Sequence, residues 1–129
     1  MAPTIRVVAA LIEREGRYLV TQRRPSAVLP NLWEFPGGRV EPGEADAAAL
    51  AREIRERLDA SVQVAEVVSV VKHDYSNYSI ELHLYRCVLE GAFRPVGVQD
   101  ARWLQSSEFD GYAFTPADEA SMNALLGRT

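Results

Sequence analysis

A glycine pair followed by acidic side chains is the part of this sequence best suited to chemistry. Gly37 and Gly38 precede Glu44, and Glu53 and Glu56 follow it three positions apart. Two carboxylates at that spacing on a helix can share one hard cation, and Mg²⁺ commonly takes one or two carboxylates together with phosphate oxygens. Glycines let backbone carbonyls approach such an ion closely. The pattern indicates a site for Mg²⁺ or Mn²⁺ and a phosphorylated ligand, and a solvated helix with surface ion pairs is the alternative.

A predicted helix at 44–58 positions these acids. The segment is rich in alanine, contains no glycine or proline, and repeats aliphatic residues every four positions around Ile54. With Ile54 at zero on a helical wheel, Glu53 lies about 100° and Glu56 about 160° away on the same flank. We therefore expect the aliphatic stripe to face the core and the acidic flank to face a cleft beside the glycines.

The rest of the chain is predicted to consist of strands, loops and one more helix. Apolar and β-branched runs predict strands at 4–12, 18–23, 62–71, 78–89 and 100–104. The stretch 24–44 contains four prolines and is predicted to be mainly loop. Thr115 before Pro116 predicts an N-cap for a helix that runs to Leu126. These elements predict an α/β fold, with residues 1–129 as one domain.

Composition excludes several classes of protein. The 129-residue chain is 47% hydrophobic and has a formal net charge of −4, which argues against binding to bulk nucleic acid. A few local arginines can still hold one polyphosphate in an acidic protein. No apolar run approaches the ~20 residues that span a bilayer, and we expect no signal peptide. Cys87 is the only cysteine, which excludes an internal disulfide and predicts a cytoplasmic location; we expect it to be buried. His73 and His83 have no partner at the spacing of metal ligands, so we do not expect them to bind a metal.

The glycine–glutamate segment resembles the signature of the Nudix hydrolases, G-x5-E-x7-R-E-U-x-E-E-x-G-U, in which U is an apolar residue. The matching residues are Gly38, Glu44, Arg52, Glu53, Ile54 and Glu56, with Ala60 at the last apolar position. The lead-in 33–38, the pair Gln22-Arg23 and the tail 114–118 are similar to the MutT-like branch of this family. The resemblance spans nearly the whole chain and implies an α/β/α sandwich with a mixed β-sheet between helices.

The resemblance also implies an activity. It implies metal-dependent hydrolysis of a phosphoanhydride bond in a (deoxy)nucleoside triphosphate, an oxidised purine or cytidine nucleotide, to the monophosphate and pyrophosphate. Glu53 is then a metal ligand and a candidate general base, Glu56 is a second ligand, and carbonyls of Gly37 or Gly38 complete the shell. Arg52 is expected to brace the loop by pairing with Glu44, with a plain surface arginine as the alternative.

Candidate substrate contacts lie on other segments. Arg23 is a candidate phosphate clamp, and a solvated strand end is the alternative. Asp118 resembles the position at which MutT-like enzymes read a nucleobase, and a first-turn acid favoured by the helix dipole is the alternative. Glu34 of the lead-in joins the substrate-binding set. Tyr78 and Phe114 are candidates for stacking on a base, with core packing as the alternative.

Two positions depart from the signature. Arg57 stands where a second glutamate is expected, and Asp59 stands where the signature has glycine. Spacing from Trp103 also puts Gly97 where many relatives carry a further metal-binding glutamate. A guanidinium about 5 Å from Mg²⁺ would be repelled by roughly 6–7 kcal/mol at an effective dielectric constant of 20. Arg57 is four residues from Glu53, which suits a salt bridge that competes with the metal.

This arginine leaves three hypotheses. In the first, Arg57 swings out and leaves a weak metal site of Glu53, Glu56 and a loop carbonyl. In the second, Arg57 replaces the metal and binds phosphate directly. In the third, the domain is inactive and binds a nucleotide or a protein partner. We expect hydrolysis of a small nucleotide by a monomer or homodimer that binds neither bulk nucleic acid nor a membrane.

Overall fold

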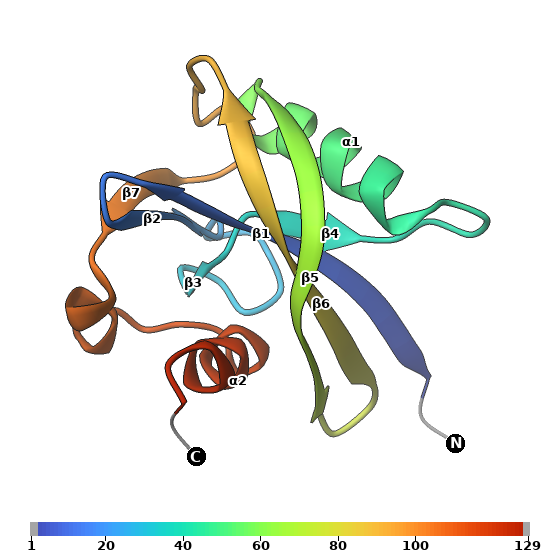
Figure 1. Cartoon of the computed structure of the whole chain (residues 1–129). Coiled ribbons are helices and arrows are strands. Elements are labelled where there is room, and N and C mark those ends of the chain that lie inside the picture. Colours follow the sequence, from blue (N-terminus) through green and yellow to red (C-terminus); the bar gives the residue numbers. More distant parts are fainter. Residues whose placement is uncertain (1–2, 128–129) are drawn as a thin grey trace.

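The computed structural model describes residues 3–127. Figure 1 shows their strands and helices, coloured along the sequence. The strands are β1 (Thr4–Arg14), β2 (Arg17–Gln22), β3 (Trp33–Glu34), β4 (Gly37–Arg39), β5 (Ser61–Asp74), β6 (Ser79–Glu90) and β7 (Asp100–Leu104). The helices are α1 (Asp46–Leu58), the 3₁₀ helix η1 (Ser106–Gly111) and α2 (Pro116–Leu125).

Strand β1 is the centre of the fold because both of its faces are buried. Val8 and Ala10 belong to the cluster that packs on α1, whereas Ala9 and Leu11 belong to the cluster that packs on α2. Successive side chains of a strand point to opposite faces, so a continuous apolar run serves two cores at once. Helices α1 and α2 therefore lie on opposite sides of the sheet (Figure 1), and the predicted α/β/α sandwich is confirmed.

The sheet is mixed, as expected. Its order is β3-β2-β1-β6-β5, with β4 also paired to β1 and β7 to β2. Strand β6 runs parallel to β1, whereas β4 pairs with β1 antiparallel and places Gly38 opposite Val8. A Cβ at Gly37 would lie 2.0 Å from the carbonyl oxygen of Val8, so only glycine fits there. This pairing fixes the glycine pair between β1 and α1.

Several predicted boundaries change. The stretch 24–44, predicted to be mainly loop, contains β3 and β4, whose two and three residues are too short to give a periodic pattern. Helix α1 begins at Asp46 rather than at residue 44, and η1 was not predicted. The predicted N-cap of α2 is confirmed, since the Thr115 side chain accepts a hydrogen bond from the backbone N–H of Asp118.

The cysteine and the two histidines, which were not predicted to act in catalysis, contact other parts of the fold. Cys87 is buried, and this burial raises the pKa of its thiol to about 12. His83 lies 2.6 Å from the Glu81 carboxylate, and His73 packs edge-on against Tyr75. No helix within residues 3–127 has the length and apolar character needed to cross a membrane.

Candidate active site

Arg52 gathers the acidic side chains of the motif. Its Nε and Nη2 donate to the two oxygens of Glu44 at 2.9 Å, so the predicted pair is present and is bidentate. Its Nη2 also donates to the carbonyl oxygen of Arg39 at 3.0 Å, which ties α1 to the end of β4. These bonds from Arg52, together with the N–H of Glu41, lower the pKa of Glu44 to about 2. Arg52 and Glu44 thus brace the loop that precedes α1.

Glu53 is the buried acid of the site, with 7% of its surface exposed. Its Oε1 accepts from Arg52 Nη1 at 3.0 Å, and its Oε2 accepts from Arg57 Nε at 2.8 Å. A Cβ on Gly38 would lie 2.2 Å from the Glu53 carboxyl carbon. Glycine at 38 therefore makes room for the carboxylate, which reaches β4 and is clamped between two guanidinium groups.

Glu56 is placed differently from Glu53. Its side chain is 58% exposed, and its oxygens lie 3.4 and 3.5 Å from Arg52 Nη1. Within the described residues no three His, Cys, Asp or Glu side chains are grouped to hold a metal ion. The guanidinium groups of Arg52 and Arg57 on either side of Glu53 repel a cation, so the described residues do not fit the metal centre that the resemblance implies.

The two other departures lie together at the end of α1. Asp59 adopts the left-handed conformation with φ 48° as the C-cap, which explains why the signature has glycine here, and its carboxylate bonds Arg94 at 2.5 Å. The backbone N–H of Gly97 donates to the carbonyl oxygen of Arg57 at 2.9 Å. A Cβ on Gly97 would lie 2.7 Å from the Glu56 carbonyl oxygen, so the loop packs directly on the helix backbone.

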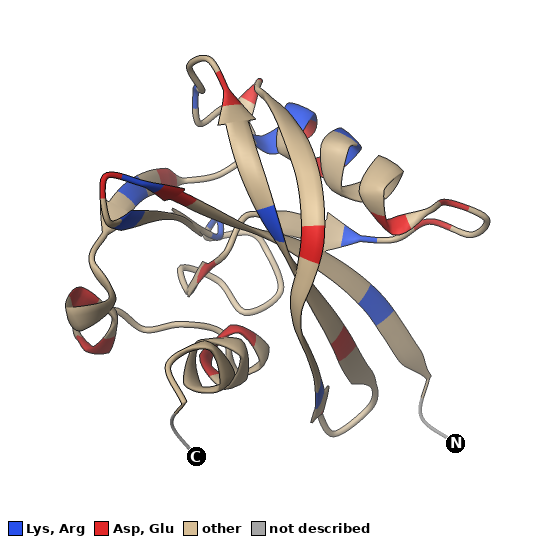
Figure 2. Ribbon diagram, in the orientation of Figure 1, with Lys and Arg blue, Asp and Glu red and all other residues tan. Residues whose placement is uncertain are grey.

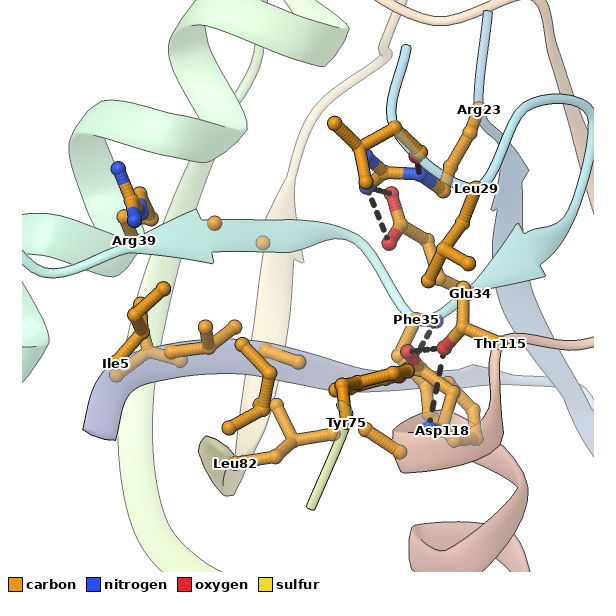
Figure 3. A pocket seen from close by; sticks show the side chains of 18 of the residues that line it. Ile5, Arg23, Leu29, Glu34, Phe35, Arg39, Tyr75, Leu82, Thr115 and Asp118 are labelled. Atoms are coloured by element: carbon orange, nitrogen blue, oxygen red, sulfur yellow. Dashed lines mark hydrogen bonds and ion pairs between the residues drawn. The ribbon is translucent and has the colours of Figure 1, made fainter. Parts of the chain in front are cut away.

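A cavity of about 650 Å³ opens beside these groups, between β1, β4, the end of α1 and the start of α2. Figure 3 shows Arg39 on β4 and Asp118 on α2 at opposite ends of it, with Arg23 and Glu34 above. Its charged lining residues are Arg23, Arg39 and Arg57 with Glu34 and Asp118. The cavity lining thus has three basic and two acidic side chains, although the chain as a whole has a net charge of −4. Along α1, by contrast, acidic and basic positions interleave (Figure 2).

Arg23 and Arg57 flank one carboxylate inside the cavity. Arg23 Nη1 lies 3.2 Å from Glu34 Oε1, and its Nε donates to the Val28 carbonyl oxygen at 2.7 Å. Arg57 Nη1 lies 3.9 Å from Glu34 Oε2. Burial raises the pKa of the Glu34 carboxyl, and the two guanidinium groups oppose that shift. Glu34 thus holds the two arginines on the same side of the cavity.

Asp118 lies on the same side of the cavity as Glu34 and is buried, with 6% of its surface exposed (Figure 3). Its Oδ1 accepts from the Phe35 N–H at 3.0 Å, and its Oδ2 accepts from the Thr115 hydroxyl at 2.5 Å. Burial, and then the nearby charge of Glu34, raise the pKa of Asp118 to about 7, against the lowering effects of the Thr115 and Phe35 bonds and of Arg23. Asp118 is therefore present both as an acid and as a carboxylate near neutral pH.

Aromatic side chains form the wall next to Asp118. Tyr75 and Tyr78, from the turn between β5 and β6, stack on each other with their rings 5.0 Å apart, and both line the cavity. Figure 3 shows Tyr75 beside Asp118. Tyr78 was among the predicted residues, but Tyr75 was missed, since the sequence places it only in a polar turn. Phe114 does not line this cavity; it is 6% exposed and packs against Phe35 and Phe109, so its role is in the core.

The structure thus sorts the predicted site residues into two groups. The residues that line the cavity are Arg23, Glu34, Gly37, Gly38, Tyr78 and Asp118. The residues that adjoin it through the Arg52 and Glu53 bonds are Glu44, Arg52, Glu53 and Glu56. Arg57, the departure from the signature that was predicted to pair with Glu53, forms that salt bridge and also lies 3.9 Å from Glu34, so it contacts both groups.

Comparison with known proteins agrees with this geometry. The sequence profile of the NUDIX domain matches residues 7–124. The CTP pyrophosphohydrolase of Escherichia coli is 37% identical over 95% of this chain and 91% of its own. The 8-oxo-dGTP diphosphatase of Haemophilus influenzae is 31% identical over 97% of this chain and 93% of its own. The solution structure of the E. coli ORF135 protein superposes with a TM-score of 0.85 at 35% identity, covering 98% of this chain and 91% of that one.

The family profile covers almost the whole chain, and two relatives above 30% identity align along nearly their full length. The resemblance drawn from the glycine–glutamate signature is therefore confirmed, and this chain belongs to the Nudix domain family, in its MutT-like branch.

Proposed function

We propose that this protein hydrolyses a nucleoside triphosphate, with a cytidine or an oxidised purine nucleotide as substrate. Water attacks phosphorus, the phosphoanhydride between the α- and β-phosphates breaks, and the products are the monophosphate and pyrophosphate. The observation that carries the proposal is one cavity lined by arginines, the signature glycines, two tyrosine rings and Asp118. The names of the relatives, a CTP pyrophosphohydrolase and an 8-oxo-dGTP diphosphatase, support this substrate class.

The base end of the cavity suits a nucleobase. Tyr75 and Tyr78 offer aromatic surface on which a planar base can stack. Asp118 accepts a hydrogen bond as a carboxylate and donates one as an acid, and its raised pKa makes both forms available near neutral pH. Cytosine has an amino N–H beside the ring acceptor N3, and an oxidised guanine has N7–H beside the O6 carbonyl oxygen, so either base edge matches these two forms.

The phosphate end brings cations and the signature acid together. Arg23 and Arg57 line the same cavity as Asp118, and we assign the binding of the phosphates to these two arginines. Glu53 stands behind Gly38 with one N–H bond to each oxygen, which leaves further lone pairs for a water molecule. We assign to Glu53 the orientation of the attacking water, and to Arg52 and Glu44 the bracing of the loop around it.

Mg²⁺ or Mn²⁺ remains the expected cofactor from the family resemblance. Within residues 3–127 the side chains do not assemble an ion site by themselves. Both cations therefore belong in the assay, alongside a reaction without added cation.

The test is product analysis with the purified chain. CTP, dCTP, 8-oxo-dGTP and UTP are incubated with Mg²⁺, with Mn²⁺ or with excess EDTA, and nucleotides and pyrophosphate are separated by anion exchange. We expect monophosphate and pyrophosphate in equal amounts, and a loss of roughly 100-fold or more in kcat for Glu53→Gln. The matched control is Glu66→Gln, because Glu66 is an exposed acid on β5 whose partner is Arg86.

A second function is favoured by one observation, the bond of Arg57 to Glu53. If that pair keeps the acid from acting, the domain binds the nucleotide without hydrolysing it. Release of inorganic phosphate, or turnover that does not change in Glu53→Gln, would contradict the proposed reaction. Binding of CTP with no turnover on any substrate would instead establish the second function.

We also propose that residues 1–129 act as one domain, as a monomer or homodimer, in the cytoplasm. The single buried cysteine supports a reducing compartment. Size-exclusion chromatography with light scattering tests the oligomeric state directly.

A further inference from the structure

Arg57 is the residue that makes this site unlike the Nudix signature, and it lines the cavity rather than turning away from it. The signature has a glutamate at this position, whereas here a guanidinium lies between the signature acid Glu53 and the cavity acid Glu34. Its side chain is only 28% exposed, so it is held in the wall rather than extended into solvent.

The bonds of Arg57 leave it free to bind a further anion. A guanidinium has five N–H donors in a fixed plane. Among the described residues its side chain bonds Glu53 through Nε at 2.8 Å and lies 3.9 Å from Glu34 through Nη1. Several donors therefore remain for a ligand in the cavity, and the bond to Glu53 fixes the direction in which they point.

The surroundings favour an anion of high charge. Arg23 Nη1 lies 3.2 and 3.4 Å from the two oxygens of the same Glu34 carboxylate, so two guanidinium groups share one acid. Arg39 adds a third cation to the lining. Guanidinium groups bind phosphate oxygens through paired, charge-assisted hydrogen bonds, which matches the oxygens of a diphosphate.

We propose that Arg57 binds the diphosphate of the nucleotide directly, so that this protein binds its substrate without a divalent cation. The guanidinium stands where the signature carries an acid. As a fixed positive charge, it neutralises part of the negative charge of the diphosphate, which relatives neutralise with a bound ion. The inference rests on the proposed function, because it assumes that the cavity takes a nucleotide.

The test is binding in the absence of metal. The dissociation constants of CTP and of inorganic tripolyphosphate are measured by calorimetry in excess EDTA for wild type, Arg57→Glu, Arg57→Gln and Arg57→Lys. We expect both ligands to bind wild type, Arg57→Glu and Arg57→Gln to weaken binding by about 10- to 100-fold, and Arg57→Lys to weaken it less. The control is Arg55→Glu, which makes the same charge change on the exposed face of α1, where Arg55 bonds Ser61; we expect less than about a threefold effect.

The outcomes separate this inference from the proposed function. No binding of CTP or tripolyphosphate by wild type in EDTA, with hydrolysis intact in Mg²⁺ or Mn²⁺, overturns the role of Arg57 and leaves the proposed function standing. Equal losses in Arg57→Glu and Arg55→Glu also overturn it, because the effect would then be one of net charge. Binding in EDTA that depends on Arg57, without hydrolysis under any condition, supports the inference and contradicts the proposed function. Thermal unfolding of each variant identifies any that fails to fold, and Arg57→Gln, which adds no acid beside Glu53, then decides.

Discussion

Gly38 gives the sharpest test of the arrangement around Glu53. A Cβ at this position would lie 2.2 Å from the Glu53 carboxyl carbon and 2.3 and 2.6 Å from its oxygens. Ordinary van der Waals contact begins near 3.4 Å, so the carboxylate must move by about 1 Å in Gly38→Ala. The atom that meets the new methyl group is the end of a flexible side chain, so we expect the protein to fold.

Moving the Glu53 carboxylate in Gly38→Ala is expected to lower both stability and catalytic rate. The bonds to Arg52 at 3.0 Å and to Arg57 at 2.8 Å both end on the carboxylate that must move. Weakening charge-assisted bonds of a buried acid is expected to lower the free energy of unfolding by about 1–3 kcal/mol. A misplacement of about 1 Å near the reacting atoms is expected to lower kcat by about 100-fold. The measurements are steady-state hydrolysis of CTP and urea unfolding.

Gly111→Ala is the matched control for this experiment. Gly111 lies in η1 and does not require a positive φ, and no heavy atom lies within 4 Å of the position that its Cβ would take. We expect its kcat to match wild type and its unfolding free energy to stay within about 0.5 kcal/mol of the wild-type value. Should Gly38→Ala behave like Gly111→Ala in both assays, the carboxylate of Glu53 would not need its place behind β4, and its assignment to the attacking water would be wrong.

Three further predictions concern other parts of the site. Gly97→Ala places a Cβ 2.7 Å from the Glu56 carbonyl oxygen and 2.9 Å from the Arg57 Cα, and because both are backbone atoms we expect a loss of about 2 kcal/mol in urea unfolding. Arg57→Glu is expected to gain weak Mn²⁺ binding in electron paramagnetic resonance titrations, and no gain over wild type would refute this. The pKa of Asp118 is raised from 3.8 to about 7, so the folded state binds more protons than the unfolded state in that window, and stability falls as pH rises through it. Asp118→Asn should remove this fall in stability between about pH 4 and pH 7, and an unchanged stability–pH profile would contradict the raised pKa.

Helix α1 could be predicted because its information is local. Its aliphatic side chains recur every four residues, and Leu50, Ile54 and Leu58 are all fully buried in the structure. Strands β3 and β4 could not be predicted in the same way. They have two and three residues, and their pairing depends on β1 and β2, which are distant in the sequence.

In the site, too, contacts between residues close in sequence could be predicted, whereas contacts between distant segments could not. Arg52 with Glu44 and Arg57 with Glu53 follow from helix spacing and from the signature, and both pairs are present. The position of Tyr75 beside Asp118 depends instead on how the turn between β5 and β6 meets α2, which no local pattern records. The sequence signal available for this wall was one tyrosine in the polar turn 73–77, next to Tyr78 at the start of the predicted strand 78–89.

The two missing acids, at 57 within the signature and at 97 outside it, are linked by packing. The Gly97 loop donates its N–H to the carbonyl oxygen of Arg57, and a side chain at 97 would run into the helix backbone. A glutamate at 97 therefore requires the loop to move away from the end of α1, which breaks the bond to the residue at 57. An acid restored at 57 alone has only Glu53 and the exposed Glu56 as partners. It follows that Arg57→Glu alone restores only a weak cation site, without the further acid at 97, whereas a guanidinium at 57 already lines the cavity with the loop as it is.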